Sequence, residues 1–126
     1  MAYVRDIMKK EIIVAKIHDR IQQISKILTE KKISNIPIIN EKNELVGIVS
    51  EQDIIRIMNS ENFMNMTAKD IMTKNVLSVK ENDPLEYVSK IFTEKPFRRL
   101  PVIRDKKVVG VITREDIISS FMSDYY

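Results

Sequence analysis

Two short stretches of the sequence, GIVSEQD at residues 47–53 and GVITRED at residues 110–116, repeat one order of residue types 63 positions apart. Each contains a glycine, two branched apolar residues, a hydroxyl and, three residues after the hydroxyl, an aspartate. This spacing is typical of a capping box at the start of a helix. Carboxylate and hydroxyl oxygens also bind sugar hydroxyls, and a helix N-terminus binds anions. The stretches therefore predict a structural cap, a ligand site, or both.

The choice of aspartate favours a ligand role beside the cap. A capping box prefers Glu or Gln at the third position after the hydroxyl, because the longer side chain reaches back better. Asp53 and Asp116 occupy this position instead. We therefore expect Ser50 and Thr113 to cap the helices that follow them, and the two aspartates to be free to face a ligand.

Few other residues could carry chemistry. The chain has no cysteine and only two glycines, which excludes disulfides, thiolate metal sites and glycine-rich phosphate loops. Its one histidine, His18, precedes a predicted helix and is expected to be a surface or turn residue. The adjacent carboxylates Glu115 and Asp116 would point apart on a helix. We expect no enzyme activity, no metal site and no cofactor.

The two stretches belong to a longer duplication. The tripeptide DIM at residues 6–8 returns at 70–72, and SKILTEK at 25–31 returns as SKIFTEK in the second half. We predict two repeats, residues 1–60 and residues 61–126. A unit of about 55 residues can hardly bury a core alone, so the repeats are expected to form one integrated tandem module.

Each repeat is predicted to fold as β-α-β-β-α, which makes the chain an α/β (α+β) protein. Asp19 and Asp83 stand where helix N-caps belong, with Gln22 and Glu86 three residues later. In the first repeat we expect strands at 12–14, 36–39 and 45–49, a helix after Asp19 and a helix after Ser50. In the second repeat we expect strands at 76–79, 100–103 and 108–112, a helix after Asp83 and a helix after Thr113.

Charge and hydropathy favour a cytoplasmic protein with a solvated surface. The net charge of +3 comes from lysines and glutamates that alternate along most of the chain, which is not typical of a nucleic-acid-binding stripe. No apolar run approaches the roughly 20 residues of a membrane span. The first ten residues lack the apolar core of a signal peptide.

Together, these features resemble a tandem pair of cystathionine beta-synthase (CBS) domains of the stand-alone type. The resemblance covers Val4 to Met122 and is carried by VRDIM and AKDIM, by the strands IPII and LPVI, and by the glycine-to-aspartate stretches described above. It implies a pseudo-two-fold pair with two clefts between the repeats, and dimerisation of pairs into a flat disc. It also implies regulation of an unknown effector protein through binding of AMP, ADP, ATP or, in some members, S-adenosylmethionine.

The resemblance further implies roles for particular residues. The carboxylates of Asp53 and Asp116 would accept hydrogen bonds from ribose hydroxyls, and Ser50 and Thr113 would reach a phosphate or ribose oxygen. Each cleft would be composite. The partners implied for Asp53 are Asp83, Phe97, Arg98 and Arg99. Those implied for Asp116 are Asp19, Ile33, Ser34 and Asn35. Adenine would lie between Ile13 or Leu77 and the matching Ile48 or Val111.

Several alternatives stay open at this point. Arg98 and Arg99 could bind phosphate bidentately or could merely solvate the edge of a strand. Asp19 and Asp83 stand where many nucleotide-binding members have threonine, and they would repel phosphate unless they face the ribose. The alternatives are therefore a ligand-free dimerisation or protein-interaction module, a module that binds S-adenosylmethionine, and a nucleic-acid-binding module.

Overall fold

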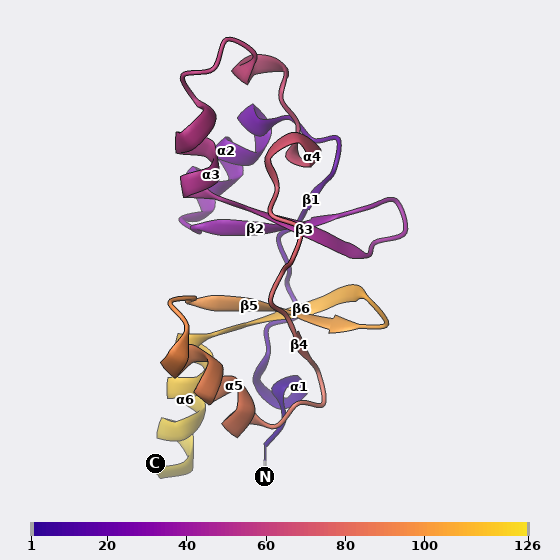
Figure 1. The fold of residues 1–126 in the computed structure, drawn as a ribbon. Helices are drawn as coiled ribbons and strands as arrows, with labels where there is room; N and C mark the ends of the chain where they lie inside the picture. Colours follow the sequence, from indigo (N-terminus) through magenta and orange to yellow (C-terminus); the bar gives the residue numbers. More distant parts are fainter. Residues whose placement is uncertain (1, 126) are drawn as a thin grey trace. The chain divides into compact units, whose positions relative to one another are not determined.

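The computed structural model describes residues 2–125, which form two compact units. The Asp53 unit comprises residues 13–76, and the Asp116 unit comprises residues 2–12 and 77–125. Each unit has one three-stranded sheet with its helices on one face (Figure 1). A helix packed on one face of a small sheet buries the apolar side of both elements.

The elements of the Asp53 unit follow the predicted order. They are β1 (Ala15–Lys16), α2 (Ile21–Lys31), β2 (Asn35–Ile39), β3 (Leu45–Ser50), α3 (Glu51–Ile57), the 3-10 turn η1 (Phe63–Asn65) and α4 (Ala68–Ile71). Strand β2 lies in the centre of the sheet, parallel to β1 and antiparallel to β3.

The Asp116 unit repeats this arrangement. Its elements are α1 (Val4–Ile7), β4 (Val79–Lys80), α5 (Leu85–Glu94), β5 (Arg99–Arg104), β6 (Lys107–Thr113) and α6 (Arg114–Tyr125). Strand β5 lies in the centre, parallel to β4 and antiparallel to β6. The predicted β-α-β-β-α order is thus confirmed in both repeats.

The first strand of each repeat is shorter and later than predicted. Residues 12–14 are not a strand, and β1 pairs through Ala15 and Lys16 only. Likewise, β4 keeps only Val79 of the predicted 76–79. The apolar runs mark segments that pack against the core, because Ile13 and Leu77 both contact the buried clusters. The strand prediction was therefore wrong at these residues, because they are apolar through packing against the core and not through pairing in a sheet.

The short helix that begins each repeat packs in the compact unit of the other repeat: α1 in the Asp116 unit and α4 in the Asp53 unit. Val4 of α1 is buried with Val79 and Val88 in the core of the Asp116 unit. Ala68 of α4 is buried with Ala15 in the core of the Asp53 unit. We call residues 3–12 and 67–76 the lead-in segments. The compact units therefore exchange these segments relative to the repeats in the sequence.

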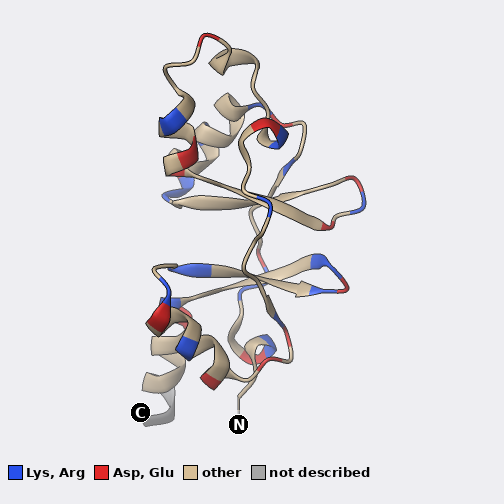
Figure 2. Ribbon diagram, in the orientation of Figure 1, with Lys and Arg blue, Asp and Glu red and all other residues tan. Residues whose placement is uncertain are grey.

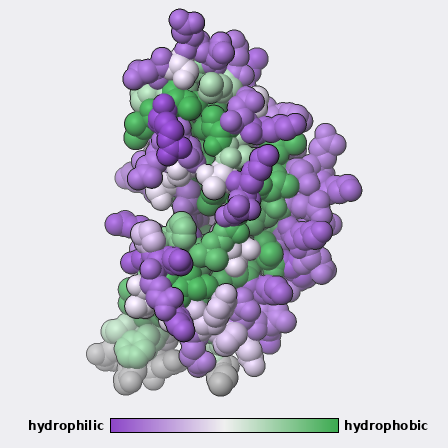
Figure 3. All heavy atoms as spheres, viewed as in Figure 1, coloured by the Kyte–Doolittle hydropathy of each residue, from purple (hydrophilic) through white to green (hydrophobic). Residues whose placement is uncertain are grey.

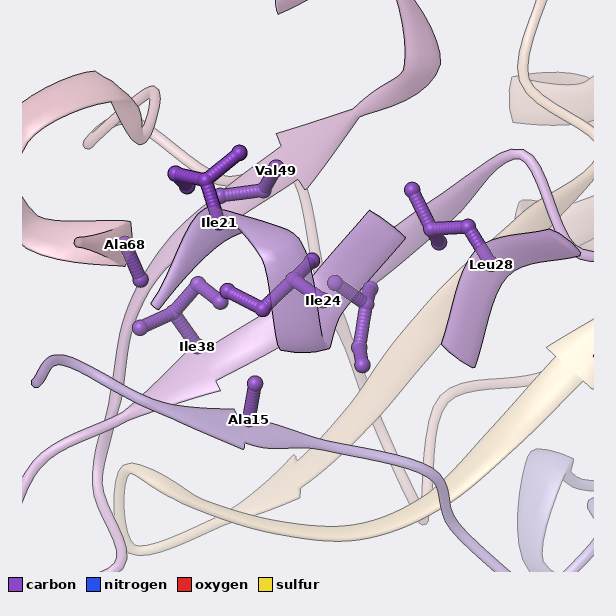
Figure 4. Close-up of a cluster of buried hydrophobic side chains, with 8 residues drawn as sticks. Ala15, Ile21, Ile24, Leu28, Ile38, Val49 and Ala68 are labelled. Atoms are coloured by element: carbon purple, nitrogen blue, oxygen red, sulfur yellow. The ribbon is translucent and has the colours of Figure 1, made fainter. Parts of the chain in front are cut away.

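Helix α2 forms the core of the Asp53 unit with one apolar face. Ile21, Ile24 and Leu28 recur at helical spacing and are buried against the sheet (Figure 4). Ile38 and Val49 meet them from β2 and β3. Full burial of each such side chain contributes roughly 1.5–3 kcal/mol, so this face fixes the helix on the sheet and with it the helix-to-strand loop.

The hairpin turns lie at the polar end of each sheet. Charged residues flank both turns, and hydrophilic side chains cover them on the face in view (Figures 2 and 3). Asn43, Asp105 and Lys106 adopt positive φ values of 65°, 50° and 70° in these turns. The candidates Ser50, Asp53, Thr113 and Asp116 lie at the opposite end, where β3 and β6 lead into helices. Among the described residues, no helix is long and apolar enough to cross a membrane.

Candidate functional site

Both aspartates of the repeated stretches close capping boxes, although their shorter side chains were expected to leave them free to face a ligand. The backbone N–H of Ser50 donates to Oδ2 of Asp53 over 2.9 Å, and the N–H of Asp53 donates back to Ser50 Oγ over 3.2 Å. Thr113 and Asp116 do the same over 2.9 and 3.1 Å. The extended N-cap backbone brings its N–H close to the first turn, so a short carboxylate reaches it.

The cap uses only one carboxylate oxygen of each aspartate. Oδ1 of Asp53 lies 3.5 Å from Nη1 of Arg56, and Oδ1 of Asp116 lies 3.5 Å from Nζ of Lys9. The aspartate side chains are 9% and 10% exposed, whereas the two cations are 73% and 60% exposed. A cap and a ligand can therefore share one aspartate, because they would use different oxygens.

A lead-in segment lies beside each aspartate, and the glycine of the repeated stretch makes room for it. A Cβ on Gly110 would lie 2.8 Å from Met8 Sδ and 2.9 Å from the carbonyl oxygen of Lys9. A Cβ on Gly47 would lie 2.5 Å from Met72 Sδ. These distances are shorter than van der Waals contact, so the methionine of DIM occupies the space that a Cβ would fill at each glycine, and at Gly110 a backbone carbonyl does so as well.

One antiparallel bridge then fixes the residue after each methionine. Lys9 N donates to the carbonyl of Val111 over 2.8 Å, and Val111 N donates back over 2.9 Å. Thr73 and Ile48 exchange the same two bonds, each over 2.9 Å. The bridges place Lys9 in one unit and Thr73 in the other at equivalent positions near an aspartate.

The strand that pairs with each N-cap residue brings a second candidate to the site. Asn35 lies opposite Ser50, and Arg99 lies opposite Thr113. Burial lowers the pKa of the half-buried Arg99 guanidinium, and the negative charges of Asp116 and Glu115 oppose this effect. Arg99 is thus held near Asp116 within one unit.

Arg114 is a site residue that the sequence did not reveal. Its guanidinium donates to the carbonyl oxygens of Phe92, Lys95 and Phe97 over 3.0, 3.0 and 2.7 Å. Its backbone N–H donates to the carbonyl of Arg98 over 3.0 Å. These bonds satisfy carbonyls at the end of α5 and hold the loop that presents Phe97, Arg98 and Arg99.

The prediction that Asp19 and Asp83 are N-caps is wrong. Helix α2 begins at Ile21 and α5 at Leu85, so both aspartates precede the helix. Asp19 Oδ2 accepts from the N–H of Lys16 over 2.9 Å, and Asp83 Oδ2 accepts from the N–H of Lys80 over 2.8 Å. They close the turn after the first strand instead. At the start of α2 it is Gln23, not Gln22, whose side chain accepts from the N-cap N–H.

The other candidates divide between the units. Ile13, Ser34, Asn35 and Ile48 belong to the Asp53 unit, and Leu77, Phe97, Arg98 and Val111 belong to the Asp116 unit. Phe97 is 39% exposed and Val111 is buried. The composite pairing implied by the resemblance joins residues of different units and stays a prediction. Among the described residues, no group of three His, Asp or Glu is placed to hold a metal ion.

The family model described as the CBS domain matches residues 4–60 and again residues 68–123. The chain belongs to the CBS domain family. Each match includes one capped aspartate and the short helix that precedes it in the sequence, α1 or α4. The recognition made from the two DIM tripeptides and the repeated stretches is thereby confirmed.

One similar relative of this CBS protein is the uncharacterized protein MJ1225 of Methanocaldococcus jannaschii. The two are 30% identical over 122 residues, which cover 97% of the chain and 44% of MJ1225. The chain thus spans less than half the length of this relative.

Two similar solved structures are CBS pairs with bound ligands. A crystal structure of CBSX2, a protein of Arabidopsis thaliana, in complex with AMP is 28% identical, covers both chains completely and has a TM-score of 0.89. The CBS domain pair of protein MJ0100 in complex with 5′-methylthioadenosine and S-adenosyl-L-methionine is 33% identical, with a TM-score of 0.80 over 98% of each chain. The fold of the chain is therefore that of CBS pairs.

Proposed function

We propose that this CBS pair is a regulatory module that senses an adenine nucleotide, AMP, ADP or ATP, and does not catalyse a reaction. The observation that carries the proposal is the aspartate in each unit, which is about nine-tenths buried and keeps Oδ1 outside its cap. A buried carboxylate oxygen at a helix start suits a ribose hydroxyl donor. The similar structures that contain AMP or methylthioadenosine support an adenosine ligand.

The proposed roles follow from what each side chain offers. Oδ1 of Asp53 and Oδ1 of Asp116 accept ribose hydroxyls, while Ser50 and Thr113 present the N-terminus of a helix. Arg98 and Arg99 supply guanidinium groups for a phosphate, and Arg114 holds their loop in place. The apolar residues proposed for the adenine face are Ile13, Ile48, Leu77 and Val111, and those proposed to assist at the rim are Asp19, Ser34, Asn35, Asp83 and Phe97.

Calorimetric titration of the chain with AMP, ADP and ATP tests this proposal. We expect Asp53→Asn and Asp116→Asn each to weaken binding by about 10- to 100-fold, as expected for loss of a charge-assisted hydrogen bond. Asp70→Asn is the matched control, because Asp70 closes the same kind of capping box with Thr67 over 2.9 Å but lies in a lead-in helix. The control should lose stability without losing affinity.

Two outcomes would contradict the proposal. One is the absence of binding by any adenine nucleotide at millimolar concentration, which would favour the ligand-free interaction module. The other is a loss of affinity in Asp70→Asn as large as in Asp53→Asn and Asp116→Asn. Such a result would show that the two aspartates affect binding only through the stability of the fold. Titration with S-adenosylmethionine in the same experiment tests the alternative ligand.

We also propose that the chain acts as a cytoplasmic homodimer that passes ligand occupancy to a partner protein. Ile55 and Ile118 occupy equivalent positions of α3 and α6 and are 64% and 61% exposed, which is unusual for isoleucine. A second copy of the chain could cover both. Ligand binding would then bias the dimer between two states of different affinity for the effector. Native mass spectrometry of the purified chain measures the dimer and any retained nucleotide together.

A further inference from the structure

The lead-in segment brings one particular cation to the Asp116 half-site, which we define as Lys9, Arg99, Thr113 and Asp116. The bridge to Val111 fixes the backbone of Lys9, and its Nζ reaches Oδ1 of the aspartate at 3.5 Å. Its side chain is 60% exposed, so it can turn toward a solvent-borne anion while its backbone stays in place.

The Asp53 half-site, defined as Asn35, Ser50, Asp53 and Thr73, has the same backbone but different charges. Thr73 takes the place of Lys9 in the bridge, and Asn35 takes the place of Arg99 opposite the N-cap. Figure 2 shows this difference, because β5 begins with a positive residue whereas β2 carries none. Two equivalent positions thus change from neutral to positive.

The cation beside Asp53, Arg56, does not make the Asp53 half-site equivalent in charge to the Asp116 half-site. Arg56 lies on the same helix, three residues after the aspartate, and its side chain is 73% exposed. It screens the carboxylate from within α3, where an i, i+3 pair is worth only a few tenths of a kcal/mol. Neither residue of the lead-in bridge nor the residue opposite the N-cap carries a charge in this unit.

We propose that Lys9 is a specificity-determining residue that makes the Asp116 half-site prefer adenosine compounds carrying a phosphate, a preference that the Asp53 half-site lacks. This rests on the proposed function. A lysine ammonium is a mobile point charge that suits a phosphate, and it acts there together with the guanidinium of Arg99. Thr73 and Asn35 offer neutral donors and acceptors, which suit an uncharged nucleoside.

The test compares AMP with adenosine by calorimetry in the full chain. An Asp53→Asn background weakens one half-site, so that the remaining high-affinity binding reports on the other. In this background Lys9→Met should weaken the binding of AMP by about tenfold, the effect of losing one charge-assisted hydrogen bond, and leave the affinity for adenosine unchanged within about twofold. Lys9→Arg should restore the preference for AMP.

Two further variants separate position from overall charge. Lys10→Met removes the same charge from the next residue, which is exposed and lies outside the bridge to Val111, so its effect should be less than about twofold. Thr73→Lys, in an Asp116→Asn background, should raise the AMP preference of the Asp53 half-site by about fivefold.

The outcomes keep the two proposals distinct. Absence of binding by both AMP and adenosine would overturn the proposed function itself. Binding of both, with an unchanged AMP-to-adenosine ratio in Lys9→Met, would overturn only the role of Lys9. A tighter AMP complex in Lys9→Met would also overturn it, because Lys9 would then be a competitor that the ligand displaces from Asp116.

Discussion

The Asp53 unit and the Asp116 unit share one backbone fold and differ in the side chains at equivalent positions. Both close a capping box through Oδ2 of an aspartate. In both, the methionine of a lead-in segment packs against the glycine of the last strand. At the equivalent positions around these features, Lys9, Arg99 and Arg114 in one unit replace Thr73, Asn35 and Glu51 in the other.

This difference shows which positions the fold constrains after a duplication. The residues that must fit are identical, because a lead-in methionine packs on each glycine and a backbone N–H donates to each capping aspartate. The residues that vary have side chains that reach solvent or a loop, where a change of charge does not disturb packing. One scaffold can therefore present two half-sites of different charge.

The largest expected effect concerns the two glycines. Gly110→Ala would place its Cβ against the carbonyl of Lys9 and against Met8, and a backbone group held by two hydrogen bonds cannot rotate away. We expect a loss of about 1–3 kcal/mol in the free energy of unfolding, the usual cost of overpacking. Urea denaturation measures it as a lower midpoint at constant slope.

Gly47→Ala is the matched comparison for this prediction. Its nearest contacts are side-chain atoms of Met72, a flexible residue that can change rotamer. A smaller loss than for Gly110→Ala is expected. Equal losses would show that the backbone contact of Lys9 does not distinguish the two units.

The second effect concerns the residue after each N-cap. Arg114→Met removes the bonds to the carbonyls at the end of α5, and we expect it to cost about 1–2 kcal/mol of stability. Glu51→Met changes the equivalent, exposed residue of α3 and should stay within about 0.5 kcal/mol. Chemical denaturation of the two variants gives the difference, and similar values would contradict a role for Arg114 in holding the loop.

Local pairing explains which parts of the fold could be predicted from the sequence. Strands β2, β3, β5 and β6 and the helices after Ser50 and Thr113 were predicted, because hairpins and caps join residues that are close in the chain. The exchange of lead-in segments was not, since Lys9 pairs with Val111 across the whole sequence. A duplicated pattern does not show which copy each lead-in segment joins.

The candidate site was predicted in part for the same reason. The spacing predicted Ser50 and Thr113 as caps, but it left Asp53 and Asp116 out of the caps, because the prediction judged the reach of aspartate from side-chain length alone. Arg114 escaped notice because its partners are backbone carbonyls, which leave no pattern in the sequence. Residue types predict side-chain chemistry better than they predict partners on the main chain.

The smallest expected effect distinguishes the hairpin ends of the two units. In the Asp116 unit Arg104 forms a two-bond ion pair with Glu81, whereas in the Asp53 unit the equivalent Asn40 accepts bonds from the turn N–H groups of Lys42 and Glu44. The hydrogen bonds and charge of Arg104 lower the pKa of Glu81 below its usual range. The ion pair therefore contributes stability above the unfolded glutamate pKa of about 4.3, and this contribution is lost as the pH falls through the lower folded value.

Thermal unfolding of wild type and Arg104→Gln from pH 7 to pH 3 should show a small difference in melting temperature that vanishes at the acid end. A difference that persists at pH 3 would instead assign the role of Arg104 to packing.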